Sequence, residues 1–217
     1  MIAEATVSDG RPVTLRRAEP EDAAALVEVI HAAFSARPVI GPPPDALKET
    51  TATVTQALLG GLGYLSLVDG RPAGVILVHS DGAAVRLGRV SVHPEFQRLG
   101  VARFMVSALL EVMAARGIAM VTLLARKDFP HLLAFWESHG FTVVGEEGNA
   151  WVLSRPLPVV AEVPDADAMR DLGRRLARLV RAGDLIVASG DLGAGKTTLA
   201  QGLGEGLGVE GPVISPT

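Results

Sequence analysis

Apolar and polar positions along the first 155 residues follow two periods, one of about two and one of about 3.6 residues. Apolar alternation predicts strands, and apolar positions three and four apart predict helices. The expected strands are Val13–Arg16, Tyr64–Val68, Ala73–His79, Ala84–Val92, Met120–Leu124, Thr142–Gly145 and Ala150–Leu153. The expected helices are one that opens at Glu19 and others over Asp45–Leu59, Gly100–Arg116 and Leu132–His139. This succession predicts an α/β fold.

A second pattern begins after Arg155-Pro156-Leu157-Pro158, where two prolines break regular structure. Beyond it we expect an amphipathic helix over Asp167–Arg181, a buried strand over Asp184–Ser189 and a helix from Thr197 to Leu207. We therefore predict two domains, residues 1–157 and residues 158–217.

Composition narrows the class of protein. Hydrophobic residues make up 48% of the chain, enough for a core, and there is no cysteine for disulfides or thiolate metal sites. The net charge of −4 gives no reason to expect nucleic-acid binding by this chain alone. The first ten residues do not resemble a signal peptide, and no apolar run is long enough to span a membrane. We expect a cytoplasmic protein.

The first candidate site is the turn Gln97-Arg98-Leu99-Gly100-Val101-Ala102, between a predicted strand and a predicted helix. Such a turn offers converging amide donors at a helix N-terminus, which suits a phosphate group. Gly100 lets the backbone approach closely, and Ala102 keeps the start of the helix unobstructed.

The segment from Val90 to Ala102, together with Phe135-Trp136-Glu137-Ser138-His139-Gly140-Phe141, resembles the GNAT superfamily of N-acetyltransferases. The resemblance covers about Arg11–Pro156. It implies the GNAT α+β fold, with a central mixed, mostly antiparallel sheet flanked by helices, and the transfer of acetyl from acetyl-CoA to a small-molecule or protein amine. It also implies the acetyl-CoA-binding residues, which are Val90, Ser91 and Val92 for pantetheine and Arg98, Leu99, Gly100, Val101, Ala102 and Arg103 for the pyrophosphate.

The usual acid and base of that superfamily are missing. Many members have Tyr at the position of Trp136, and members that act on protein N-termini tend to have Glu and Asn at the positions of Leu124 and Phe129. The catalytic residues therefore stay unassigned. Either transfer relies on proximity and water, or the domain binds acyl-CoA without turnover, or another group serves, the candidates being His79, His93, His131, Glu95 and Tyr64.

The second candidate site fits G-x-x-x-x-G-K-T, the sequence of a nucleotide-binding P-loop. Its residues are Gly190, Asp191, Leu192, Gly193, Ala194, Gly195, Lys196, Thr197 and Thr198. Lys196 would reach the β- and γ-phosphates of ATP, and the hydroxyl of Thr197 would bind Mg²⁺.

This loop, the later Gly206-Leu207-Gly208 and the final Ser215-Pro216-Thr217 resemble the TsaE family, the ATPase component of bacterial tRNA threonylcarbamoyladenosine synthesis. The resemblance implies ATP, Mg²⁺ and the other proteins of that synthesis as partners. It covers about the first third of that domain, so we expect a truncated P-loop segment without ATPase activity. An alternative reading makes the first domain a non-catalytic acyl-CoA-binding module attached to an ATPase that carries the main function.

Overall fold

The computed structural model describes residues 1–38, 40, 44–81, 84–211 and 213–214. The chain divides into two compact units, Met1–Val160 and Ala161–Thr217. No helix of the described ranges is both long enough and apolar enough to cross a membrane.

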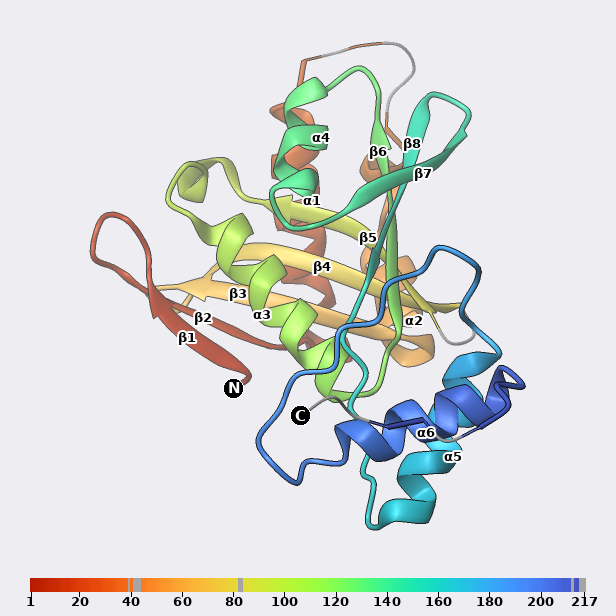
Figure 1. The fold of residues 1–217 in the computed structure, drawn as a ribbon. Coiled ribbons are helices and arrows are strands. Elements are labelled where there is room, and N and C mark those ends of the chain that lie inside the picture. Colours follow the sequence, from red (N-terminus) through yellow and green to blue (C-terminus); the bar gives the residue numbers. More distant parts are fainter. Residues whose placement is uncertain (39, 41–43, 82–83, 212, 215–217) are drawn as a thin grey trace. The chain divides into compact units, whose positions relative to one another are not determined.

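The first unit is built on one sheet of eight strands in the order β1-β2-β3-β4-β5-β6-β8-β7 (Figure 1). Every neighbouring pair is antiparallel except β5 and β6, which run parallel. The strands are β1 (Ala3–Thr6), β2 (Pro12–Arg17), β3 (Leu62–Val68), β4 (Arg71–Asp81), β5 (Ala84–Val92), β6 (Met120–Arg126), β7 (Thr142–Glu147) and β8 (Ala150–Pro156). The predicted mixed, mostly antiparallel sheet is confirmed, and β1 is a strand that the sequence did not predict.

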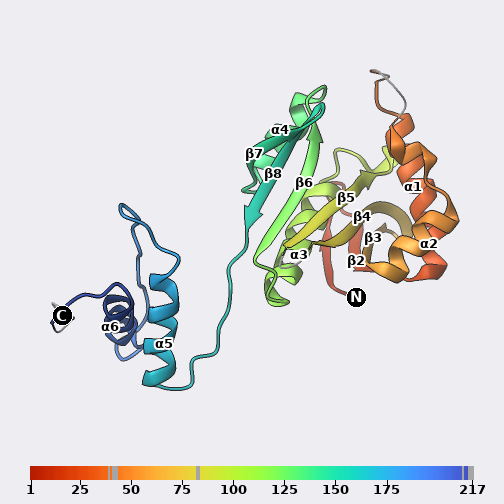
Figure 2. The same ribbon diagram turned by 90° about the vertical axis from the view of Figure 1, so that its right-hand side faces the viewer.

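Helices cover both faces of this sheet, as the two views show (Figures 1 and 2). On one face, α1 (Ala23–Ser35) and α2 (Thr51–Gly60) bury Leu26 and Leu58 against Leu65 and Val75 of the sheet. On the other face lie α3 (Val101–Ala115) and α4 (Pro130–Glu137). Short 3-10 turns precede α1, α2 and α3, at Pro20–Asp22, Asp45–Lys48 and Pro94–Phe96.

The helix predicted over Asp45–Leu59 is wrong as a single helix. A 3-10 turn ends at Lys48, the backbone of Glu49 and Thr50 is extended, and α2 starts afresh at Thr51. The cause is local, because the Thr50 hydroxyl accepts a hydrogen bond from the Thr53 amide and the Thr53 hydroxyl accepts one from the Thr50 amide. This reciprocal cap fixes the start of the helix at Thr51 and leaves Glu49 outside the helix.

The second unit has two described helices, α5 (Ala166–Ala177) and α6 (Lys196–Gly206), which pack against each other. Glycines permit this approach, since a Cβ built on Gly173 would lie 2.4 Å from the Leu199 carbonyl oxygen and one on Gly202 would lie 2.1 Å from that of Arg170. The helix that we predicted over Asp167–Arg181 is present as α5, which starts one residue earlier and ends at Ala177.

The strand predicted over Asp184–Ser189 is also wrong. These residues form no regular structure, and Leu185 and Val187 are 86% and 79% exposed. A strand is stable only when its backbone pairs with another strand. The described part of this unit contains no strand with which it pairs.

Candidate functional site

The sheet of the first unit opens between its two parallel strands. β5 pairs with β6 only from Ala84 to Leu87, opposite Met120 to Leu123. Beyond that point β6 continues along β8, and β5 continues along β4. Among the described residues, those from Gly88 to Val92 therefore have one edge without a strand partner.

A β-bulge accompanies the opening. The register of β4 and β5 shifts between Val75 and Leu77, and Arg89 takes a left-handed backbone conformation with φ +51°. The extra residue of a bulge shifts the alternation, so the side chains after it point to the opposite sheet face from the one that strict alternation predicts. Val85 and Leu87 belong to the core on the α3 side before the bulge, and Val90 and Val92 pack against that same core after it.

The turn that follows β5 presents free amides. Arg98 and Gly100 both have positive φ, +64° and +90°, and α3 begins immediately afterwards at Val101. None of the six amides from Arg98 to Arg103 donates a hydrogen bond to a described acceptor. The Gln97 side chain donates to the Val92 carbonyl oxygen at 3.1 Å and ties the turn to the end of β5. An anion at this helix start would receive several donors and the favourable end of the helix dipole.

A cleft of about 300 Å³ lies at the open end of β5. It reaches from the C-terminal end of α1 to the N-terminal end of α4. Since these helices lie on opposite faces of the sheet, the cleft connects the two faces. Its lining residues are Ala33, Ala36, Arg37, Pro38, Val92, Gln97, Phe129, His131 and Leu132.

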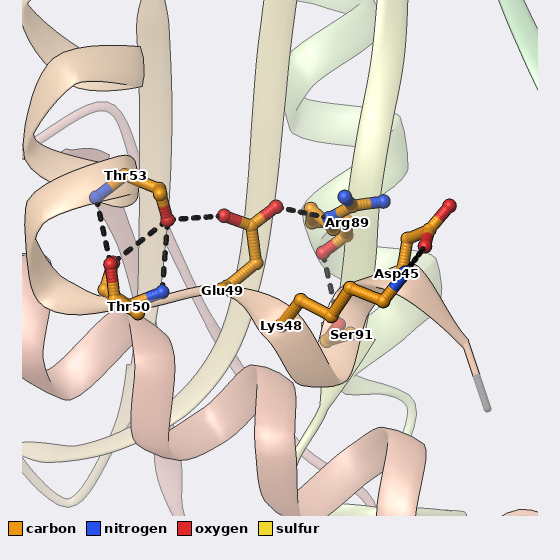
Figure 3. Close-up of polar contacts among 7 residues, drawn as sticks. All are labelled: Asp45, Lys48, Glu49, Thr50, Thr53, Arg89 and Ser91. Carbon is orange, nitrogen blue, oxygen red and sulfur yellow. Dashed lines mark hydrogen bonds and ion pairs between the residues drawn. The ribbon is translucent and has the colours of Figure 1, made fainter.

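A polar network joins the segment before α2 to the bulge (Figure 3). Glu49 accepts a hydrogen bond from Arg89 Nε at 2.7 Å and one from the Thr53 hydroxyl at 2.6 Å. Burial raises the pKa of Glu49, but the hydrogen bonds from Thr53 and Arg89 and the charges of Arg89 and His79 outweigh it, so the pKa is lowered overall. Glu49 is thus held as a carboxylate.

The five candidates for acid and base take very different places. Tyr64 is fully buried in the core, and burial raises its pKa. His93 caps the turn at Pro94 by accepting from the Glu95 amide, and Glu95 is paired with Arg71 at 2.6 Å. His79 is exposed on β4. His131 is the one of the five that lines the cleft.

At three positions this chain has an apolar residue where many superfamily members have Tyr, Glu or Asn, and these residues mostly serve packing. Trp136 is 6% exposed and packs edge-on against Phe141, with ring centroids 5.2 Å apart. Phe129 is buried and lines the cleft, and Leu124 is the first residue of β6 beyond its pairing with β5. None of these side chains can move a proton.

In the second unit, the glycine-rich loop precedes α6. Gly193 and Gly195 both have φ +84°, and Lys196 Nζ donates to the carbonyl oxygens of Gly190 and Asp191 at 2.7 and 2.8 Å. The amides of Gly195, Lys196 and Thr197 have no described acceptor. In the described part of the chain, no group of three or more His, Cys, Asp or Glu is placed to hold a metal ion. The carbonyl oxygens of the loop therefore hold the Lys196 ammonium group, and the amides at the start of α6 remain available as donors.

Residues 33–141, half of the chain, match the Acetyltransferase (GNAT) family. The chain belongs to the GNAT acetyltransferase family. The strand opening, the turn with free amides and the cleft all lie within or beside this match.

Solved GNAT structures share the fold. The PaiA N-acetyltransferase from Thermoplasma acidophilum, solved in complex with coenzyme A, has a TM-score of 0.60 and 15% identity and covers 66% of this chain and 98% of its own. The ribosomal-protein-S18-alanine N-acetyltransferase from Escherichia coli has a TM-score of 0.58 and 20% identity and covers 69% of this chain and 97% of its own. At this identity the likeness establishes the GNAT fold alone.

Residues 163–217 match the threonylcarbamoyl adenosine biosynthesis protein TsaE, so a TsaE segment follows the GNAT domain in one chain. The TsaE protein of Streptomyces coelicolor is 76% identical over 49 residues, which are 23% of this chain and 33% of that protein. The chain thus spans about a third of the length of this curated relative.

Sequence reasoning missed Arg37, which lines the cleft, and the Glu49–Arg89 pair at the bulge of β5. The sequence does carry a signal of the bulge. The core-facing apolar residues of β5 are Val85 and Leu87 at odd positions and then Val90 and Val92 at even positions, so the alternation shifts by one residue between them. The pairing of Glu49 with Arg89 spans forty residues and leaves no local pattern.

Proposed function

We propose that residues 1–157 form a GNAT domain that binds acetyl-CoA and transfers its acetyl group to an amine. The observation that carries the proposal is the run of six free amides from Arg98 to Arg103 at the start of α3, next to the unpaired edge of β5. The amides would hold the pyrophosphate, with Arg98 and Arg103 adding charge. The backbone of Val90, Ser91 and Val92 would pair with the pantetheine arm.

When bound, acetyl-CoA would supply the acyl group as a thioester: the amine nitrogen would bond to the carbonyl carbon as the carbon–sulfur bond breaks, and the proton that the amine loses would be passed on to the leaving thiolate. The cleft positions the amine by giving it a route from the α1 face to the open edge of β5. Phe129 and Leu132 exclude water from one wall of the cleft. His131 is the titratable side chain placed to take up the amine's proton, directly or through one water molecule.

Two measurements test this proposal. Calorimetry with acetyl-CoA tests binding, and release of free CoA in the presence of an amine panel tests transfer. The thiol of CoA can be followed without background, because the chain contains no cysteine. Binding without CoA release from any amine would leave only the alternative of a non-catalytic acyl-CoA-binding module.

For residues 158–217 we propose a nucleotide-binding segment of the TsaE type. The free amides of Gly195, Lys196 and Thr197 favour phosphate binding, with Lys196 on the β- and γ-phosphates of ATP and the Thr197 hydroxyl on Mg²⁺. The match to TsaE supports a place in tRNA threonylcarbamoyladenosine synthesis beside the other proteins of that pathway, in the cytoplasm. Because the segment before the loop forms no strand, we expect no ATP hydrolysis by these 217 residues, and a turnover assay tests this.

A further inference from the structure

Arg37 is a charged side chain that lines the cleft without a described partner. It lies two residues beyond the end of α1 and is partly buried. No carboxylate of the described residues lies within 4.0 Å of its guanidinium, and that group donates no hydrogen bond to a described acceptor. The neighbouring residues 39 and 41–43, which lie outside the description, are Val, Gly, Pro and Pro and have no acidic side chain.

The guanidinium is held in place by an aromatic ring. Its central carbon lies 3.8 Å from the centroid of the Phe34 ring, and Phe34 packs against the core on the α1 face. Stacking occupies one flat face of a guanidinium and leaves its five N–H donors free in the plane. A stacked arginine of this kind is preorganised to bind a planar anion with two parallel hydrogen bonds.

The groups around Arg37 do not neutralise its charge, so an anion bound there would be stabilised. None of the residues that line the cleft is acidic. The nearby Arg126 already has its own partner, since it donates to Asp128 at 2.7 Å and to the Ile40 carbonyl oxygen at 3.1 Å. Burial, followed by the charge of Arg126, lowers the pKa of Arg37 from its ordinary value. A partly buried charge that has no anionic partner among the described residues is costly, and a bound anion would lower that cost.

The place of Arg37 argues against a phosphate of the cofactor as that anion. Arg37 belongs to the α1 side of the sheet, whereas the turn from Arg98 to Arg103 opens α3 on the opposite side. The six free amides of that turn already provide a separate anion site. A ligand that enters along α1 toward the open edge of β5 would pass Arg37 first.

We propose that Arg37 binds a carboxylate of the acetyl acceptor, which makes the acceptor a small amine that also carries a carboxylate group, such as a free amino acid. This proposal rests on the acetyl-transfer function proposed above and assigns a substrate class to the same cleft. The cleft volume of about 300 Å³ suits a molecule of this size.

The test compares product analogues that differ only in their charge. The probes are N-acetyl amino acids with a free carboxylate and the same compounds as carboxamides, titrated into the CoA-saturated chain by calorimetry. We expect at least one acid to bind about 10- to 100-fold more tightly than its amide, the range that a charge-assisted hydrogen-bond pair supports. In Arg37→Gln the preference should disappear, and in Arg37→Lys it should be partly restored. The affinity for CoA should stay within about twofold in both variants.

Arg116→Gln is the matched control, because Arg116 is an exposed arginine just after α3 and does not line the cleft. It should keep the preference for acids, and melting curves should show that all variants fold. Equal binding of acids and amides, no binding of either, or a preference that survives in Arg37→Gln would each overturn the proposal. A loss of CoA affinity in Arg37→Gln would overturn it in favour of a phosphate of the cofactor. Failure of wild-type protein to bind CoA would instead remove the proposed function, and this inference with it.

Discussion

Glu49 and Arg89 form an ion pair of 2.7 Å that joins the start of α2 to the bulge of β5. Their side chains are 16% and 33% exposed, so the pair is partly shielded from water. The bulge is the place where the sheet opens beside the cleft, and Arg89 occupies it with a strained positive φ. The pair therefore supports the strand geometry on which the candidate acetyl-CoA site depends.

Replacing Glu49 by Gln should destabilise the GNAT domain by about 1–3 kcal/mol at pH 7, since a charge-assisted hydrogen bond is lost. The pKa of Glu49 is lower in the folded state than in the unfolded state, where it is about 4.3. The carboxylate therefore adds its full stabilisation to the folded state above about pH 4.3, and this stabilisation is lost as pH falls through the lower pKa of the folded state. Urea unfolding at pH 7, 4 and 3 compares the free energy of unfolding above and below this range. Both tryptophans, Trp136 and Trp151, lie in the first unit, so their fluorescence reports on that unit alone.

Asp45→Asn is the control for that experiment. Asp45 forms an ion pair with Lys48, but both side chains are 76% exposed. An ion pair that is so exposed adds little to the stability of the folded state. We expect no measurable change in stability. A Glu49→Gln variant as stable as wild type at pH 7, or one whose deficit is the same at all three pH values, would contradict the role assigned to the pair.

Gly100→Ala tests the turn at the start of α3. Gly100 has φ +90°, which costs an alanine about 1–2 kcal/mol, while its Cβ would meet no atom within 4 Å. We expect a modest loss of stability and an affinity for CoA at least about 10-fold weaker, because the amides no longer converge. Gly117→Ala is the matched control, with φ +75° and open space at the other end of α3. It should lose similar stability and keep its affinity for CoA, and equal affinities in the two variants would count against this site.

Trp136 should act as a core residue and have no part in proton transfer. Trp136→Ala should destabilise the domain by about 3–5 kcal/mol through the cavity that it leaves beside Phe141. Trp136→Phe should keep the fold, the CoA affinity and the rate of CoA release, which unfolding curves and a thiol assay measure. A rate that falls 100-fold in Trp136→Phe with unchanged CoA affinity would show that the indole takes part in the reaction.

His131→Gln should lower the rate of acetyl transfer by about 100-fold or more, the usual contribution of a general base, and leave CoA affinity unchanged. His79→Gln is the control, because His79 is exposed on β4 and does not line the cleft. Release of free CoA with the same amine panel measures the rate in both variants, and calorimetry measures their affinity for CoA. If both variants retain the wild-type rate, transfer depends on proximity and water alone.

In the TsaE segment, Gly202→Ala should separate α5 from α6. A Cβ at Gly202 would lie 2.1 Å from the Arg170 carbonyl oxygen, and the close backbone contact leaves no room for it. Hydrogen exchange of the amides in both helices should rise sharply in this variant. Glu205→Ala removes the ion pair with Arg174 at the same interface and should change hydrogen exchange little, since both side chains are almost half exposed and water weakens such a pair. Protection that survives in Gly202→Ala would contradict the packing described above.

The periodicity of apolar residues was enough to predict most strands of the first unit and the helix α3, because each buries one face against a continuous core. The prediction of a strand over Asp184–Ser189 was wrong because a strand also needs a neighbouring strand to pair with, and the residues of the segment itself do not show whether one is present. The turn around Gly100 could be proposed as a phosphate-binding site from the sequence because its glycine and the following helix are local features. Arg37 and the Glu49–Arg89 pair were not visible, because contacts between residues distant in sequence appear only once the sheet and its helices have formed.

The most direct test of the central claim is calorimetric titration of acetyl-CoA into the 217-residue chain, with Gly100→Ala beside wild type. We expect one binding site per chain in wild type and an affinity at least about tenfold weaker in the variant. No binding to wild type at millimolar acetyl-CoA would contradict an acetyl-CoA site at this turn, as would equal affinity in the two proteins.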